Sequence, residues 1–424
     1  MSVSNPDSSV HARSADTRIL QFDVLRGFAV LGIFWIAVAA FGLPYGANAL
    51  PTLLGTASTT NLTLWAITDV FLEGAMRGLF SMLFGAGAVI LLDRLTGPPA
   101  DLAQVDRYFR RQLWLIAFGM VHGYLLLWPH DVLYDYGVIG VLLFPLRNLA
   151  PRTLFLIGVC AIAFANVELD PAGMLAAIRD GTQAPAAATT DPAFVDWLRQ
   201  QVAADLELYR SGYLDILVAQ APEVAANESA GLYRNMLFDI GGMMLLGMAL
   251  FRWGVLDGQR STGFYALLAV AGYVCGVLMR GANVYHALVY GFDADALRAM
   301  EGVNYDFGRL PMTLGHVGLI GLLCRWRVLA GPLRALAAVG RLSLTHYLGQ
   351  TVFAITLFYG FGFGLYGRLE RSELLLVCLA LWAVLIPFSL WWLKRFRYGP
   401  MEWLWRSLAR GAWQPNRIRT QRNA

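Results

Sequence analysis

His122 is the side chain in this sequence best suited to acid–base chemistry. It lies in the segment WLIAFGMVHGYLLLW (114–128), which is otherwise apolar. A neutral imidazole exchanges protons near pH 7, and a carboxylate that orients it makes it an effective general base. Asp131 follows shortly after and is the candidate for that carboxylate. The pattern predicts that His122 deprotonates a hydroxyl or an amine; the alternative is a histidine that only packs in the core.

A metal site near His122 is not predicted. His130, Asp131 and Asp135 are residue types that bind metals, and they lie close together in the sequence. A zinc site is expected to contain an HExxH motif or a set of cysteine ligands, and neither accompanies these residues. The four cysteines lie in apolar segments and are interpreted as small core residues.

A second polar group lies in the apolar segment 65–92. Asp69, Glu73 and Arg77 follow one another at intervals of four residues, which would place them on one face of a continuous helix. An ionisable side chain at the centre of a membrane span costs about 2.5 to 3.5 kcal/mol, so each needs a partner or a function. Two interpretations stay open. Arg77 is held between carboxylates as a structural triad, or Asp69 and Glu73 bind substrate while Arg77 stabilises negative charge on an acyl oxygen.

Two further sets of polar residues lie in other apolar segments. His346 and Gln350 share one face of the predicted helix 341–360, either as hydrogen-bonding groups between helices or as the lining of a substrate cavity. Asp23 and Arg26 lie at the start of the first apolar segment. They form a structural pair, or Arg26 binds an anionic cofactor that arrives from the cytoplasm.

The composition predicts that these residues are carried by membrane-spanning helices. Of the 424 residues, 57% are hydrophobic and only 15% are charged, against roughly 25% charged in soluble domains. A helix needs about 20 apolar residues to cross a bilayer. The fold class is therefore all-α, a polytopic membrane protein with about ten spans. The predicted spans lie near residues 24–43, 65–92, 112–128, 132–147, 153–168, 235–252, 262–280, 309–324, 341–360 and 373–393.

The distribution of arginine predicts the orientation. Arginines precede the first apolar segment, follow the second and the fourth, and fill the tail from Lys394 to Arg422, whereas residues 44–64 contain no Lys or Arg. Positive charge stays in the cytoplasm, so both termini are expected there. The net charge of +4 is this bias, and no nucleic-acid partner is expected. A cleaved signal peptide is the alternative for the first segment; its long leader, which contains two aspartates, favours a retained anchor.

Three regions are expected along the chain. Residues 1–21 form a disordered cytoplasmic tail, and residues 22–396 form the transmembrane domain. An extracytoplasmic insertion near 169–234 contains a predicted amphipathic helix over 191–213, which either caps an outward cavity or is a surface connector. Residues 397–424 contain an interfacial helix for the inner leaflet, rich in Trp and Arg, and a tail.

Several motifs resemble those of the YeiB-like family of bacterial membrane proteins of unknown function. They are FDVLRGFAVLGIF (22–34), EGAMRGLFSMLFGAG (73–87), HDVL (130–133), GRLSLTHYLGQ (340–350) and RYGPMEWLWRSL (397–408). The resemblance extends over nearly the whole chain and implies a multi-pass protein of the bacterial cytoplasmic (inner) membrane.

The opening helices are also similar to those of the transmembrane acyltransferase superfamily, which includes heparan-α-glucosaminide N-acetyltransferase. Asp23, Arg26 and Gly27 match its first-helix motif, and Asp69 matches the aspartate that opens the second helix. This resemblance implies transfer of an acyl group from cytoplasmic acyl-CoA to an acceptor across the membrane. Residues 44–64 lack the outer-loop histidine of the heparan enzyme, so the role of base would pass to His122.

Two functions are therefore predicted. In the first, acyl-CoA is the donor and a glycan, a lipid or a small molecule is the acceptor, with His122, Asp131 and Arg77 as catalytic residues. Arg26 and the inner arginines would hold the phosphates of CoA, and Asp69, Glu73, His346 and Gln350 would bind substrate. In the second, the protein is a transporter or a lipid-binding or small-molecule-binding protein without covalent chemistry, and its histidines carry protons.

Overall fold

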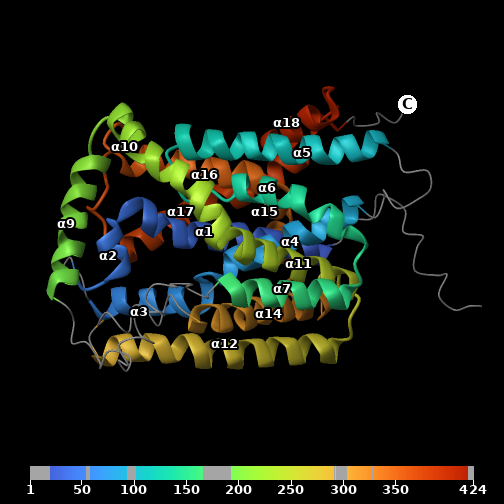
Figure 1. Cartoon of the computed structure of the whole chain (residues 1–424), viewed down its shortest axis with the longest axis horizontal. Helices are drawn as coiled ribbons and strands as arrows, with labels where there is room; N and C mark the ends of the chain where they lie inside the picture. The colour runs from blue at the N-terminus through green and yellow to red at the C-terminus, as the bar shows by residue number, and fades with distance from the viewer. Residues whose placement is uncertain are drawn as a thin grey trace, which may run out of the picture.

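The computed structural model describes residues 20–53, 58–92, 102–165, 192–290, 292, 303–326 and 329–418. In these residues the secondary structure is helical, apart from one isolated bridge between Phe396 and Arg417. Most helices run side by side along the long axis, and α9 (Pro192–Tyr209) stands across one end (Figure 1). The predicted all-α fold class is confirmed. Of the predicted tail 1–21, residues 1–19 lie outside the described residues, and Leu20 and Gln21 belong to the first helix rather than to a disordered tail. The insertion up to residue 191 and the last residues 419–424 also lie outside the described residues.

Among the described residues, five helical segments are long and apolar enough to cross a membrane, or six if a bent pair is one span. The five are α1 (Leu20–Gly42), the segment Thr59–Leu92, α12 (Thr262–Tyr290), α14 (Val303–Trp326) and α17 (Arg371–Leu393). The bent pair ends in α11 (Leu237–Arg252). The protein is thus a helical membrane protein with about five candidate spans, fewer than the ten predicted.

The other predicted spans coincide with helices that are shorter or more charged. They are α5 (Leu102–Met120), α6 (Leu133–Leu143), α7 (Pro151–Ala165), α11 and α16 (Ser343–Phe358). The 16 residues of α16 extend about 24 Å, less than the roughly 30 Å of a hydrocarbon core. α5 is long enough, but charged residues fill its first half. The remaining described helices are α2 (Tyr45–Ala49), α10 (Tyr213–Ala226), α15 (Ala330–Arg341) and α18 (Pro400–Arg410).

Glycines let the central helices pack against one another at short range. A Cβ atom on Gly85 of α4 (Ala75–Leu92) would overlap the Met244 carbonyl of α11, and one on Gly247 of α11 would overlap the Met82 carbonyl of α4. Small residues allow such close approach, on which helix association in membranes depends. These contacts place α4 and α11 together at the centre of the bundle.

The second apolar segment is broken near its middle. It consists of α3 (Thr59–Ile67), a π-helical turn (Thr68–Leu72) and α4, and the break falls at Glu73 and at Gly74, whose φ is +68°. The prediction of one continuous helix with Asp69, Glu73 and Arg77 on a single face is therefore wrong. Gly74, directly after Glu73, permits the left-handed backbone that a continuous helix excludes.

Side chains from α12 and α14 bind the backbone carbonyls around this break. His316 Nε2 lies 2.8 Å from the Phe71 carbonyl oxygen, and Arg280 donates to the Asp69 carbonyl from Nε (3.3 Å) and Nη2 (3.2 Å). Thr313 Oγ1 donates to the Ala75 carbonyl at 3.2 Å. Irregular backbone at membrane depth requires such partners because no water is present to replace them. His316 is thereby explained as a structural residue.

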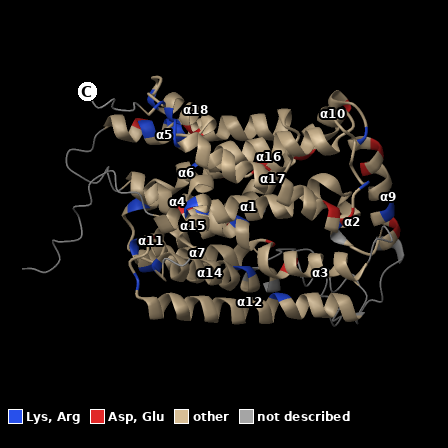
Figure 2. Ribbon diagram, turned by 180° about the vertical axis from the view of Figure 1, so that it is seen from behind, with Lys and Arg blue, Asp and Glu red and all other residues tan. Residues whose placement is uncertain are grey.

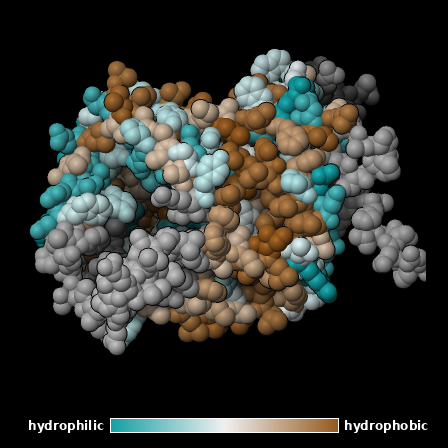
Figure 3. Space-filling model, viewed as in Figure 1, coloured by the Kyte–Doolittle hydropathy of each residue, from teal (hydrophilic) through white to brown (hydrophobic). Residues whose placement is uncertain are grey.

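The charges are segregated along the long axis. Lys and Arg positions, blue on the ribbon, gather at the end that carries α18 and the start of α5, and Asp and Glu positions, red, lie near α2 and α9 at the opposite end (Figure 2). Hydrophobic surface covers the side formed by α12, where Leu267, Val270 and Leu278 are more than 60% exposed (Figure 3). This surface is what a lipid-facing helix requires.

The insertion packs over the end of the helix that carries His122. Its predicted amphipathic helix is confirmed as α9, and α10 follows it. Tyr213 Oη donates to the Leu125 carbonyl (2.8 Å), and Asn227 Nδ2 donates to the Pro129 carbonyl (3.0 Å). These two contacts fix the insertion directly over the turn that joins α5 to α6.

The helix predicted near the C-terminus is present as α18, and it packs against the bundle. Trp405 Nε1 donates to the Arg111 carbonyl at 2.8 Å. Glu402 Oε1 accepts hydrogen bonds from the backbone N–H groups of Leu344 (2.7 Å) and Thr345 (3.1 Å), in the first turn of α16. Glu402 therefore caps α16 from another helix.

Candidate functional site

The backbone at the end of α5 brings His122 and Asp131 together. α5 continues into a π-helical turn over Val121–Leu125, and the chain then reverses at Leu127, which has a φ of +55° and is fully buried. A leucine rarely adopts this conformation, and it persists only where packing compensates for the strain. Gly119 allows the approach, since a Cβ atom there would lie 2.7 Å from Asp131 Oδ2.

His122 is fully buried, and both of its ring nitrogens are engaged. Nδ1 lies 2.6 Å from Asp131 Oδ1, and Nε2 lies 2.8 Å from Thr351 Oγ1 of α16. The expected contact of His122 with Asp131 is present, and the catalytic roles of both residues stay a prediction. Thr351 was not predicted. It lies 229 residues further along the chain, and nothing in the sequence near His122 points to it.

Asp131 accepts hydrogen bonds from other groups as well. Tyr134 donates its backbone N–H to Oδ2 at 2.9 Å, and Tyr347 Oη donates to Oδ1 at 3.3 Å. The carboxylate that accepts from these donors also accepts the Nδ1–H of His122. This assignment leaves Nε2 unprotonated, so that the Thr351 hydroxyl donates to it. The result is a line from carboxylate to imidazole to hydroxyl, defined here as the Asp131–His122–Thr351 line.

The two other predicted residues of α16 do not join this line through a hydrogen bond. His346 Nε2 lies 2.7 Å from Ser389 Oγ of α17, so the predicted bond between helices is found at His346. Gln350 is 3% exposed, and its Nε2 has no hydrogen-bond partner among the described residues. An unsatisfied buried amide costs about 1 to 3 kcal/mol, so Gln350 retains a donor that a bound carbonyl would satisfy.

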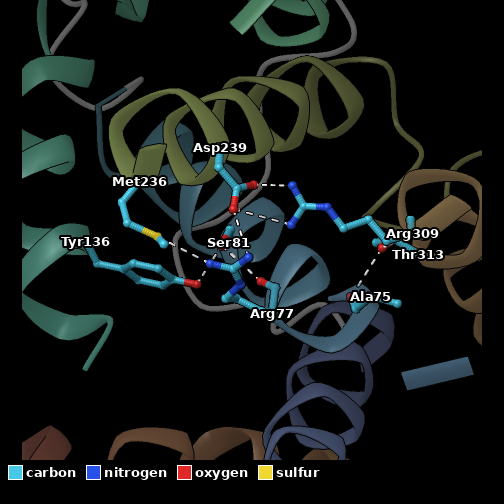
Figure 4. A network of polar contacts seen from close by, with 8 residues as sticks. All are labelled: Ala75, Arg77, Ser81, Tyr136, Met236, Asp239, Arg309 and Thr313. Atoms are coloured by element: carbon cyan, nitrogen blue, oxygen red, sulfur yellow. Dashed lines mark hydrogen bonds and ion pairs between the residues drawn. The ribbon is translucent and has the colours of Figure 1, made fainter. Parts of the chain in front are cut away.

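Arg77 belongs to a separate group of buried charges (Figure 4). Its Nη2 lies 2.9 Å from Asp239 Oδ2 of α11, and Arg309 of α14 pairs with the same carboxylate. Arg77 also donates to the sulfur of Met236 at 3.3 Å. The structural triad required Arg77 to pair with Asp69 and Glu73. Its partner in this group is Asp239 instead. Asp239 and Arg309 were missed because they lie in other helices, and no periodicity links them to Arg77.

Asp69 pairs with Arg280 of α12, which is 1% exposed, at 2.6 Å. Asp69 Oδ2 has no hydrogen-bond partner among the described residues. The ring of Tyr305 lies between the two buried arginines of α12 and α14, with the guanidinium carbons of Arg280 and Arg309 each 4.9 Å from its centroid. The ion pairs thus form a charged layer around the broken segment.

Three arginines gather around the middle of α5, at Arg111, which precedes His122 by about three turns of helix. Arg26, Arg111 and Arg406 lie against the rings of Phe22 (4.8 Å), Trp405 (3.7 Å) and Tyr398 (4.6 Å), respectively. Burial lowers the pKa of Arg406, and the charges of Arg26 and Arg410 lower it further, against the opposing effect of Tyr398 and Glu402.

These three guanidinium groups have few anionic contacts. Arg26 has an ion pair with Asp23 at 4.0 Å, and in the described residues Arg111 and Arg406 have no hydrogen-bond acceptor. Like charges held close together on ring faces form a site for an anion with several oxygens. We call Arg26, Arg111 and Arg406 the arginine cluster.

The fold and these sites define a helical membrane protein with a buried hydroxyl–imidazole–carboxylate line and an arginine cluster at the end rich in basic residues. The family model described as "Protein of unknown function (DUF418)" matches residues 250–412, which include Thr351 and Tyr347. His122 and Asp131 precede the matched segment.

The chain belongs to the YeiB-like family. It is 31% identical over 421 residues to a protein of Escherichia coli (strain K12) described as "Uncharacterized protein YeiB", covering 96% of this chain and 100% of the relative. It is 28% identical over 425 residues to "Uncharacterized protein YxaH" of Bacillus subtilis (strain 168), covering 96% and 98%. The predicted family is confirmed, and the relation to acyltransferases stays a prediction.

Proposed function

We propose that the protein is a membrane acyltransferase that moves an acyl group from cytoplasmic acyl-CoA to a hydroxyl or amine of a glycan, a lipid or a small molecule. The observation that carries the proposal is the Asp131–His122–Thr351 line, with Nδ1···Oδ1 at 2.6 Å and Nε2···Oγ1 at 2.8 Å. An imidazole fixed on one side by a carboxylate and facing a hydroxyl on the other is the arrangement of base-catalysed acyl transfer.

In the proposed reaction His122 Nε2 takes a proton from a hydroxyl or amine that attacks the thioester carbonyl. Asp131 holds the ring in its tautomer and stabilises the imidazolium that forms. His122 then returns the proton to the thiolate of CoA as the C–S bond breaks. The role of Arg77 as the group that stabilises the acyl oxygen stays a prediction, because its guanidinium contacts Asp239 in the present structure.

The arginine cluster is proposed to hold the phosphates of CoA. Guanidinium groups bind phosphate through paired hydrogen bonds, and Arg111 and Arg406 have none to a described residue. Arg111 and His122 lie on the same helical segment, separated by about 16 Å of helix rise. The extended pantetheine arm of CoA bridges a separation of this kind.

The proposed topology has ten spans, with both termini in the cytoplasm of a bacterium and the protein in its inner membrane. The basic end in Figure 2 would then face the cytoplasm, which supports entry of CoA from that side. The acceptor would bind near the end covered by α9 and α10.

The test is acyl-CoA binding and CoA release by the full chain in phospholipid nanodiscs, with short, medium and long acyl chains. We expect the wild type to release thiol and His122→Gln to bind acyl-CoA without turnover. His130→Gln is the matched control, because this ring lies against Trp128 (5.4 Å between centroids) and outside the Asp131–His122–Thr351 line. Equal loss in both variants would contradict the assignment of His122.

The broken segment and its buried ion pairs favour a second function, a transporter. Discontinuous helices with intramembrane charges form the substrate sites of many transporters. In that case no acyl-CoA would bind at any chain length, and proton-coupled solute uptake into vesicles would be lost on Asp69→Asn substitution.

A further inference from the structure

We propose that Thr351 is the first acceptor of the acyl group, so that transfer passes through an ester on its Oγ1. The inference rests on the proposed acyltransferase function and adds a covalent intermediate to it. Hydroxyl nucleophiles, threonine included, act in this way when an adjacent base removes their proton.

The position of the Thr351 hydroxyl is the first argument. Asp131 occupies Nδ1 of His122, and Thr351 Oγ1 occupies Nε2 at 2.8 Å. An acceptor hydroxyl that reached the base directly would first have to displace Thr351. A thioester that approached Thr351 would find its nucleophile already paired with the base.

The direction of the hydroxyl proton is the second argument. The Tyr347 carbonyl oxygen, the alternative acceptor in the preceding turn of α16, lies 3.4 Å from Oγ1. The distance to His122 Nε2 is 0.6 Å shorter, and hydrogen-bond strength falls steeply at the longer separation. The proton that must leave during attack is therefore on the side of the base.

The surroundings of Thr351 are the third argument. Thr351 is 3% exposed and His122 is fully buried, so the ester would form in a site that excludes bulk water and would resist hydrolysis. The adjacent residue, Gln350, carries the buried Nε2 without a described partner. The carbonyl oxygen of a bound acyl group would supply the acceptor that this amide lacks.

The reaction then has two balanced halves. Thr351 Oγ1 forms a bond to the thioester carbonyl carbon and gives its proton to His122 Nε2. The tetrahedral intermediate collapses, the C–S bond breaks, and the thiolate leaves with that proton as free CoA. In the second half the acceptor hydroxyl or amine gives its proton to His122 and attacks the ester carbonyl, and Thr351 Oγ1 leaves and recovers the proton.

The experiment measures the intact mass of the full chain in nanodiscs after incubation with acyl-CoA and no acceptor, followed by peptide fragmentation. We expect one acyl group on wild type, located at Thr351, together with release of CoA. Thr351→Val keeps the shape and removes the nucleophile, so it should lose the adduct and at least about a hundredfold in transfer rate. Thr351→Ser keeps a hydroxyl and should retain both.

The outcomes separate the two proposals. CoA release and acyl transfer that persist in Thr351→Val, with no ester on wild type, would overturn the role of Thr351 and leave the acyltransferase proposal intact. An acyl group found on another residue, such as a cysteine, would also overturn it. Failure of wild type to bind or cleave any acyl-CoA would overturn both. Because the adduct is located on wild type, the test does not depend on the folding of a variant.

Discussion

Replacing Asp239 by Asn should destabilise the fold more than the loss of any one exposed ion pair. Asp239 lies between two arginines, with its side chain 11% exposed, Arg309 1% exposed and Arg77 28% exposed. Asparagine has nearly the same shape, so the substitution removes charge and leaves packing in place. Both guanidinium groups then stay in the interior without their counter-ion.

The magnitude follows from the two pairs. Removing one partner of a buried ion pair costs about 3 to 5 kcal/mol, which applies to Arg309. The partly exposed Arg77 adds about 1 kcal/mol or less. A sum of about 4 kcal/mol corresponds to roughly a thousandfold in the folding equilibrium, since each 1.4 kcal/mol is about tenfold.

The assay is reversible unfolding in mixed micelles of increasing SDS content, followed by tryptophan fluorescence. Asp196→Asn is the matched control, because its pair with Arg199 on α9 is more than 60% exposed on both sides and should be worth about 1 kcal/mol or less. The double variant Asp239→Leu with Arg309→Met should recover most of the loss, since apolar residues of similar volume replace buried pairs well. A midpoint for Asp239→Asn equal to that of Asp196→Asn would refute the reasoning.

Three other outcomes are expected. Gly247→Ala should cost about 1 to 3 kcal/mol because its Cβ would overlap the Met82 carbonyl, whereas Gly87→Ala, with open space around it, should be neutral or stabilising in the same unfolding assay. Burial raises the pKa of Glu402 despite its hydrogen bonds from α16, so the folded state binds the proton more tightly. Wild type should therefore gain stability relative to Glu402→Gln as pH falls from about 7 towards about 4.3, and a constant difference would contradict this. Arg111→Ala should weaken acyl-CoA binding at least about tenfold in equilibrium dialysis, and the exposed Arg410→Ala should not.

Local sequence patterns were sufficient to predict the helices and the contacts between residues that are close in the chain. Apolar runs indicate the helices, and apolar spacing predicts α9. The pairing of His122 with Asp131 follows because only a short turn separates them. Ten spans stay a prediction, because the described residues contain about five candidate spans, α16 is short and the first half of α5 carries several charges.

Contacts between distant helices could not be predicted in this way. Helical periodicity reports which residues share a face, but not which helix that face meets. The pairs Arg280 with Asp69 and His122 with Thr351 are separated by 211 and 229 residues. The break at Gly74 had a local signal, a glycine beside Glu73, and a continuous apolar run concealed it.

Some buried polar side chains bind the backbone, and others bind mainly side chains. We expect the first kind to be structural and the second kind to include the reactive groups. His316 and Thr313 bind backbone carbonyls beside the break, and Arg280 binds both such a carbonyl and Asp69, so these side chains support the irregular main chain in a dry interior. His122 and Thr351 contact each other through side chains at 2.8 Å. Within the Asp131–His122–Thr351 line, whose carboxylate also accepts the Tyr134 backbone N–H, this side-chain contact is the part that the main chain does not require, and it is where a reaction is expected.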